Sequence, residues 1–145
     1  MKVQALGHAV LKVRNLERSE QFYNGVLGMP VAARHETMPM TFFTLGNHHD
    51  LAILAVGDDA PDAPRNAPGL YHIALKVGDT LDELRAVKEH LEQRGVKIDA
   101  TIDHTVSQSL YLRDPDGNGV ELYIDASEVW KEDPQQVAQG VPMTI

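Results

Sequence analysis

Cysteine is absent from the 145 residues of this chain. Its absence excludes disulfides, thiolate metal ligands and cysteine nucleophiles. Long apolar runs are also missing, and no segment approaches the roughly 20 apolar residues that a membrane helix needs. The N-terminal stretch of residues 1–8 carries one basic residue and no apolar run typical of a signal peptide. We therefore expect a cytoplasmic protein without a membrane segment.

Positive charge is scarce as well. Lysine and arginine number 13 against 21 acidic residues, which gives a formal net charge of −8. This balance argues against nucleic acid or an anionic membrane surface as a partner. A hydrophobic content of 43% is ordinary for a globular protein, and the length fits a single domain spanning residues 1–145.

A short motif occurs twice in the chain. Residues 7–13 read GHAVLKV and residues 71–77 read YHIALKV, so that His8 and His72 occupy matching places 64 positions apart. Such a recurrence is the sequence signature of an internal repeat. It predicts two equivalent strands that carry equivalent histidines.

Each of these strands is followed by the same series of patterns. A leucine-led helical pattern ends at a glycine, Gly28 or Gly95, as a helix C-cap would, and three strand-like segments follow. The expected helices cover about residues 16–27 and 81–94, and the expected strands cover 31–35, 40–45, 50–56, 96–103, 108–113 and 119–125. We predict an α+β fold of two tandem βαβββ modules: module one at about 4–56, a linker at 57–68, module two at about 69–125 and a C-terminal tail at 126–145.

This arrangement resembles the vicinal oxygen chelate superfamily over about residues 5–125. The superfamily includes glyoxalase I, fosfomycin-resistance proteins, methylmalonyl-CoA epimerase and extradiol ring-cleaving dioxygenases. The resemblance implies that the paired modules curl their sheets into a partly closed mixed barrel around a metal cleft. The turn Asp-Pro-Asp-Gly-Asn at 114–118, with Glu121 after it, occurs across this superfamily.

The predicted metal ligands are His8, His72 and Glu121. A single histidine on a half-apolar strand usually has a packing role, but two at equivalent repeat positions favour ligands. The resemblance places a carboxylate ligand at Glu121, and a metal dication would offset the cost of burying it; the alternative is that Glu121 faces solvent. The matching position in the first half is Ala52, so the fourth ligand usual in glyoxalase-type sites is missing. Two histidines and one carboxylate suit Fe(II) first and Mn(II) second, with open coordination positions.

His104 and the pair Leu110-Tyr111 precede the turn in a pattern that looks like extradiol dioxygenases in particular. The resemblance implies that His104 is the catalytic acid/base, since imidazole moves protons near neutral pH, and that Tyr111 orients the reacting oxygens. The alternatives are a histidine that caps a strand end and an ordinary strand aromatic.

Other candidates receive a lower rank. His48 and His49 are adjacent, and neighbouring strand residues face opposite ways, so we expect turn and edge residues that do not share one site. Trp130 resembles the tail tryptophan of ring-cleavage relatives, which would either cover the pocket or anchor the tail. The apolar residues 141–145 are expected to dock on the domain or on a partner subunit.

The function expected from the resemblance is that of a metal-dependent, catechol 2,3-dioxygenase-like extradiol enzyme of aromatic catabolism. It would act on a catechol or related vicinal diol with O2, as a homodimer whose modules pair within a chain or swap between subunits. The alternatives are a fosfomycin-resistance-like thiol transferase, a glyoxalase- or epimerase-type lyase or isomerase, and a bleomycin-resistance-type binder. His104 counts against the first, the missing fourth ligand against the second and the intact metal triad against the third.

Overall fold

The computed structural model describes residues 1–64 and 66–145; position 65, in the predicted linker, lies outside the described residues. The chain forms two compact units, Met1–Arg65 and Asn66–Ile145. Both units have the predicted order strand–helix–strand–strand–strand, and the fold is α+β with two mixed sheets. Within the described part of the chain, no helix is long and apolar enough to cross a membrane.

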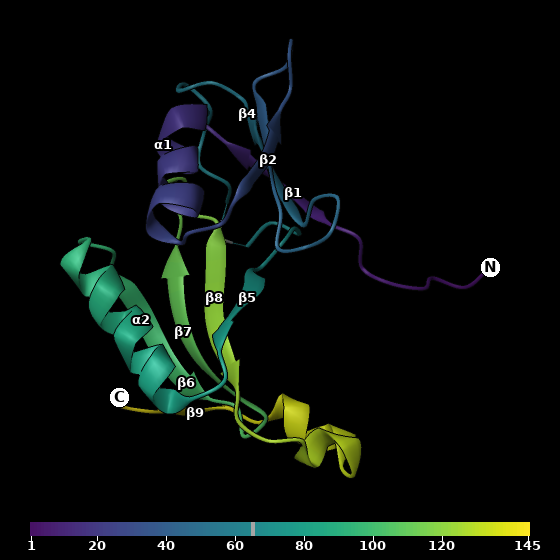
Figure 1. Ribbon diagram of the computed structural model, residues 1–145, viewed down its shortest axis with the longest axis vertical. Helices are drawn as coiled ribbons and strands as arrows, with labels where there is room; N and C mark the ends of the chain where they lie inside the picture. Colours follow the sequence, from purple (N-terminus) through teal and green to yellow (C-terminus); the bar gives the residue numbers. More distant parts are fainter. Residues whose placement is uncertain (65) are drawn as a thin grey trace. The chain divides into compact units, whose positions relative to one another are not determined.

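The first unit is a four-stranded sheet in the order β1-β4-β3-β2 (Figure 1). Strands β1 and β4 run parallel, and the other neighbours are antiparallel. The elements of this unit are β1 (Ala9–Val13), α1 (Leu16–Glu20), the π-helical segment η1 (Gln21–Val26), β2 (Val31–Arg34), β3 (Met40–Phe43) and β4 (Leu51–Ala55).

The helix of the first unit departs from the predicted single α-helix. Asn15 caps its start by accepting a hydrogen bond from the backbone N–H of Arg18 at 3.0 Å. After Glu20 the helix widens into the π-helical segment η1, a winding that sequence periodicity does not reveal. It ends at Gly28, whose φ of +73° is the left-handed conformation that a C-capping glycine adopts, as predicted.

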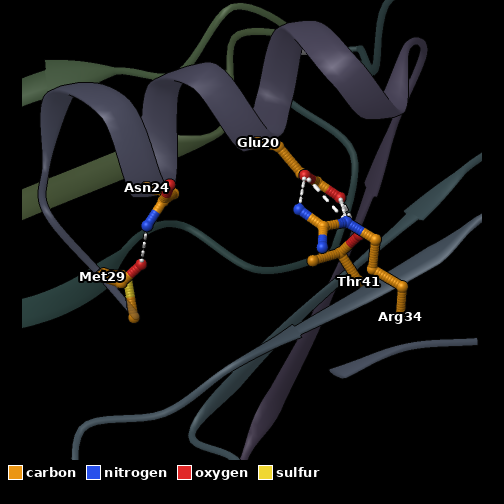
Figure 2. Close-up of polar contacts among 5 residues, drawn as sticks. All are labelled: Glu20, Asn24, Met29, Arg34 and Thr41. Carbon is orange, nitrogen blue, oxygen red and sulfur yellow. Dashed lines mark hydrogen bonds and ion pairs between the residues drawn. The ribbon is translucent and has the colours of Figure 1, made fainter. Parts of the chain in front are cut away.

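Polar contacts attach this helix to its own sheet and to the loop that follows (Figure 2). The Glu20 carboxylate accepts hydrogen bonds from the Arg34 guanidinium, at 2.7 Å from Nη2, and from the hydroxyl of Thr41. The Asn24 amide donates to the Met29 carbonyl at 2.8 Å. Because Thr41 is fully buried, its hydroxyl is out of reach of water, and Glu20 supplies the hydrogen-bond acceptor that it needs.

The second unit is a five-stranded sheet in the order β5-β8-β7-β6-β9, with α2 lying along it (Figure 1). Strands β5 and β8 are parallel, and the remaining neighbours are antiparallel. The elements are β5 (Ile73–Gly78), α2 (Leu81–Gln93), β6 (Ile98–Asp103), β7 (Ser107–Arg113), β8 (Gly119–Asp125), the 3-10 helices η2 (Val129–Lys131) and η3 (Pro134–Ala138), and β9 (Val141–Pro142).

Helix α2 packs against β5, β6, β7 and β8 on one side of the second sheet. A reciprocal capping box between Thr80 and Glu83 fixes its start, and Leu84 and Leu91 are its buried residues. The side chains of β7 and β8 point alternately to the two faces of the sheet, and the buried apolar ones are Leu110, Leu112, Val120, Leu122 and Ile124. By the two-residue period of a strand, Ser109, Tyr111 and Glu121 share the opposite face.

The C-terminal tail adds strand β9 to the free edge of β6. Val141 pairs with Asp103, Pro142 pairs with Ile102, and the Met143 N–H donates to the Thr101 carbonyl. The apolar tail therefore docks on its own unit, one of the two outcomes expected for it. Trp130, in η2, is 45% exposed.

Candidate metal centre

His72 and Glu121 meet in the second unit. His72 stands one residue before β5, so the prediction that it lies within the strand was wrong by one position: bridge pairing with β8 begins only at Ile73. Ala74 pairs with Glu121, and His72 is two residues before Ala74 on the same face. The Nε2 atom of His72 lies 3.0 Å from Oε2 of Glu121.

This pair fits a metal ion. Two ligand atoms at about 2.1 Å from one ion and at right angles to each other are about 3.0 Å apart. The other carboxylate oxygen of Glu121 accepts a hydrogen bond from Ser109 Oγ at 2.6 Å, and Glu121 is only 8% exposed. The other ring nitrogen of His72, Nδ1, is buried and has no hydrogen-bond partner among the described residues. The buried carboxylate oxygen of Glu121 and Nε2 of His72 are thus a pair of donors that fits a divalent cation.

The turn between β7 and β8 sets the position of Glu121. The buried Asp114 carboxylate accepts hydrogen bonds from the backbone N–H groups of Asp116 and Asn118, at 2.9 and 2.8 Å, and from the Asn118 amide. Gly119 follows, and a Cβ there would come within 2.4 Å of the Tyr71 carbonyl oxygen. The glycine thus allows β8 to pass close beside the segment that carries His72.

His104 and Tyr111 form a hydrogen-bonded chain with the tail. The Nε2 atom of His104 lies 2.8 Å from the Tyr111 hydroxyl, and its Nδ1 atom lies 2.7 Å from the Gln139 carbonyl oxygen. A carbonyl only accepts, so Nδ1 carries the proton of the neutral ring and Nε2 is left to accept. The Tyr111 ring also packs against His72, with ring centroids 5.6 Å apart, which joins the two pairs into one cluster.

Burial raises the pKa of the Tyr111 hydroxyl to about 12, and the negative charge of Glu121 adds to the effect. The hydroxyl therefore stays protonated at neutral pH and can donate. It faces a cavity of about 540 Å³ within the second unit. The wall combines polar and charged groups with apolar side chains and a glycine: Tyr71, His72, Asp99, His104, Tyr111, Arg113, Ala100, Ile102, Leu112, Val120 and Gly119.

His8, the third predicted ligand, lies in the first unit. It stands one residue before β1 and not within it, because pairing with β4 begins at Ala9 opposite Leu51. Ligand nitrogens of His8, His48 and His49 lie within 4.8 Å of one another. The expectation that His48 and His49 cannot share one site was wrong. They occupy a loop before β4, where strand alternation does not apply.

The strand registers confirm that Ala52 is the counterpart of Glu121. Ala52 pairs with Val10 as Glu121 pairs with Ala74, and Val10 and Ala74 are matching repeat positions. Ala52 is fully buried and offers no donor atom. Ser109 is a residue of the site that sequence reasoning missed; the available signal was its place two residues before Tyr111 on the same strand face.

Residues 5–122 match the model of the Glyoxalase/Bleomycin resistance protein/Dioxygenase superfamily, and the chain belongs to that superfamily. The chain is 39% identical over 130 residues to a catechol-2,3-dioxygenase of Bacillus subtilis, covering 88% of this chain but 44% of that protein. It is 30% identical to the glutathione transferase FosA of Serratia marcescens, covering 84% and 82% of the two chains. A glyoxalase/bleomycin resistance protein/dioxygenase domain from Frankia has the same fold, with a TM-score of 0.71 at 21% identity, covering 86% of this chain and 100% of that one.

Proposed function

We propose that this chain is a metal-dependent extradiol-type dioxygenase that cleaves the ring of a catechol or related vicinal diol with O2. The observation that carries the proposal is the chain of contacts from His104 through Tyr111 to His72 and Glu121 beside one cavity. It combines a proton acceptor, a proton donor and a metal-ligand pair. The sequence repeat and the family support His8 as the third ligand of the same ion.

The ion would be Fe(II), with Mn(II) as the second choice, because two imidazoles and a carboxylate suit both. When bound, it would supply a point at which a diol and O2 both bind and exchange electrons. Both oxygen atoms of O2 enter the ring-opened product, so the reaction needs no external reductant.

The residues of the second unit manage the protons. With Nδ1 donating to the Gln139 carbonyl, His104 Nε2 accepts the hydrogen bond of the Tyr111 hydroxyl. When the substrate is bound, the Tyr111 hydroxyl, which keeps its proton because its pKa of about 12 is far above neutral, would turn to donate to a substrate oxygen, and the freed Nε2 would accept a proton from a substrate hydroxyl. The apolar side chains Ile102, Leu112 and Val120 offer a surface for an aromatic ring. A volume of about 540 Å³ is within the range of roughly 300–1,000 Å³ that small-molecule sites have.

The Bacillus subtilis relative bears the name of this activity, and the site supports it, but the chain spans less than half of that relative's length. The catechol activity, the aromatic-catabolic role and a homodimeric assembly are accordingly parts of the proposal.

The test is O2 uptake by protein loaded anaerobically with Fe(II), on a panel of simple catechols. We expect O2 consumption with a yellow ring-opened product, and we expect His104→Phe to slow turnover by about 10²–10⁴-fold, the usual contribution of a general acid–base group, while iron is retained. His90→Phe, on the surface of α2, is the matched control and should leave the rate unchanged. Stoichiometric binding of zinc or nickel, with no O2 consumed on any catechol, would contradict the proposal.

A second candidate is thiol transfer of the fosfomycin-resistance type, favoured by the similarity to FosA over most of that protein's length. It would use Mn(II) and glutathione, and it needs no O2. Loss of fosfomycin from a mixture with Mn(II)-loaded protein and glutathione, insensitive to His104→Phe, would favour this reading over the first.

A further inference from the structure

The cavity wall in the second unit carries two charged side chains that the proposed reaction does not use. Arg113 is the last residue of β7, and Asp99 is the second residue of β6. Of the described residues that line the cavity, Arg113 is the one with a permanent positive charge and Asp99 is the one with a carboxylate. Because the few polar and charged groups of a small-molecule site fix the orientation of its ligand, this pair is a candidate for substrate recognition.

The strand pattern explains why Arg113 faces the cavity. Arg113 is two residues after Tyr111 in β7, so the two side chains project from the same face of the sheet. Two strand residues span about 6.8 Å, which sets how far the start of the Arg113 side chain lies from that of Tyr111. The residue paired with Arg113 is Gly119, which adds no side chain to this part of the wall.

A β-bulge brings Asp99 to the same part of the cavity. The pairing of β6 with β7 shifts between Ile98 and Ala100, so Asp99 is the extra residue on the bulged strand. Ala100 pairs with Tyr111 on the cavity side, and in a regular strand Asp99 would therefore point to the opposite face. The bulge turns its side chain toward the cavity, where it contacts Arg113.

The contact between the two charged groups is a loose ion pair. Arg113 Nε lies 3.4 Å from Asp99 Oδ2, which is longer than the roughly 2.7–2.9 Å of a charge-assisted hydrogen bond. The two side chains are 56% and 37% exposed, so the pair contributes little to stability. Asp99 also faces a second cation, since its Oδ1 atom lies 3.6 Å from Nζ of Lys97. One carboxylate thus serves two cations, and the group as a whole is positive.

The Arg113 guanidinium is held in place and keeps unused donors. Its Nη1 atom donates to the Gly117 carbonyl at 2.9 Å, which attaches it to the turn between β7 and β8. Within the part of the chain that the structure describes, no hydrogen bond engages its Nη2 atom. A guanidinium presents its N–H groups as a planar fork, the geometry that matches a carboxylate.

We propose that Arg113 selects a catechol that carries a carboxylate on a short substituent, and that this carboxylate competes with Asp99 for the guanidinium. The inference rests on the proposed function, in which the diol lies beside the Tyr111 hydroxyl. A group attached to the ring directly or through one carbon would then extend along β7 toward Arg113. The cavity of about 540 Å³ is in the size range of sites for larger ligands than a single aromatic ring, so a substituent fits.

The experiment compares two catechols of nearly equal size, 3,4-dihydroxyphenylacetate, which is anionic, and 4-ethylcatechol, which is neutral. O2 uptake by the Fe(II)-loaded chain gives the ratio of their kcat/KM values. A chemical-shift titration of the chain without metal and without O2 gives the ratio of their dissociation constants. We expect both ratios to favour the anionic catechol. Arg113→Gln should reduce the preference about tenfold, as expected for the loss of a charged hydrogen bond at a half-exposed site, and should leave the values for 4-ethylcatechol nearly unchanged.

Asp99→Asn is a second variant with the opposite expected result. It removes the carboxylate that competes for the guanidinium, so the preference for the anionic catechol should increase. If the ion pair had only a structural role, Arg113→Gln and Asp99→Asn would act in the same direction and on both catechols alike. Raising the NaCl concentration should weaken the preference of the wild type, because salt screens exposed charges.

Arg85→Gln is the matched control. Arg85 is a half-exposed arginine on α2 that forms an ion pair with Asp82 at 2.7 Å, and it does not line the cavity. Its loss should leave both ratios unchanged. Arg113→Lys keeps the positive charge and should retain part of the preference, which separates the charge from the hydrogen bond to the Gly117 carbonyl. Circular dichroism and the unfolding temperature report whether each variant remains folded.

The inference is overturned if the wild type does not prefer the anionic catechol, or if Arg113→Gln weakens its action on both catechols equally. Failure of the proposed function gives a different result. If no catechol supports O2 uptake but the titration still shows a preference that depends on Arg113, the dioxygenase activity is rejected and the carboxylate subsite stands. Absence of both O2 uptake and binding overturns both.

Discussion

Ser109→Ala is the sharpest perturbation of the site in the second unit. The hydroxyl of Ser109 is fully buried and donates to Glu121 Oε1 at 2.6 Å, while the other carboxylate oxygen faces His72. Alanine would leave Oε1 in a buried place without its donor and would free the carboxylate to rotate. An outer-shell contact of this kind is worth about 10–100-fold in metal affinity, which corresponds to about 1.4–2.7 kcal/mol.

The affinity of Mn(II), followed by the electron paramagnetic resonance signal of the free ion, measures this effect. Ser107→Ala is the matched control, since Ser107 lies two residues earlier in β7 and pairs with Asp125 instead of Tyr123. Thermal unfolding without metal separates a general loss of stability from a loss of binding. If Ser109→Ala binds Mn(II) within twofold of the wild type, then Ser109 does not orient a metal ligand.

Three further predictions concern both units. The Arg34 hydrogen bond lowers the pKa of Glu20, so the charged carboxylate stabilises the fold above the ordinary pKa of 4.5, and this stabilisation is lost as pH falls through the lowered folded-state pKa. Glu20→Gln should therefore lower the free energy of unfolding in urea by about 1–2 kcal/mol at pH 7, and the difference from the wild type should disappear in acid. Gly119→Ala should drive its Cβ into the Tyr71 carbonyl, lower the unfolding temperature and weaken Mn(II) binding more than Ser109→Ala does. Removal of residues 139–145 takes away the acceptor of His104 Nδ1, so O2 uptake should slow and its pH profile should shift while iron is retained; an unchanged profile would contradict a positioning role for the tail.

The repeat made much of the fold predictable. Apolar alternation and the two helix-ending glycines located every strand of both modules to within a few residues, because those signals arise from local periodicity and backbone conformation. The helix of the first unit was placed correctly, but its π-helical second half was not foreseen. The pattern of apolar residues does not distinguish a π-helical segment from an α-helical one.

The site was predictable only in part. Glu121 pairs with Ala74, two residues after His72, and this pairing brings the two predicted ligands together. It depends on strand register, which a sequence pattern does not supply. The role of Ser109 depends on a diagonal contact across two strands, and the cluster around His49 depends on a loop that breaks strand alternation. Each of these features arises from tertiary pairing, so residue types and spacing alone do not reveal it.

The registers also show how the two units have diverged. Phe42 pairs with Ala52 in the first unit as Tyr111 pairs with Glu121 in the second. At the next position of the same face, Met40 takes the place of Ser109. The first unit therefore lacks the carboxylate, the phenol and the serine hydroxyl of the second, and it keeps only the histidine of the repeat.

This asymmetry bears on the chemistry. The two groups to which the proposed reaction assigns proton transfer, His104 and Tyr111, both belong to the second unit. Substitution of Ala52 by glutamate would restore the missing carboxylate in a fully buried place. Under the proposed function, in which His8 of the first unit binds the same ion as His72 and Glu121, we expect the new carboxylate to occupy a coordination position that the diol or O2 needs, and so to reduce O2 uptake while metal affinity rises. Undiminished turnover in Ala52→Glu would mean that open positions on the metal are not what the site requires.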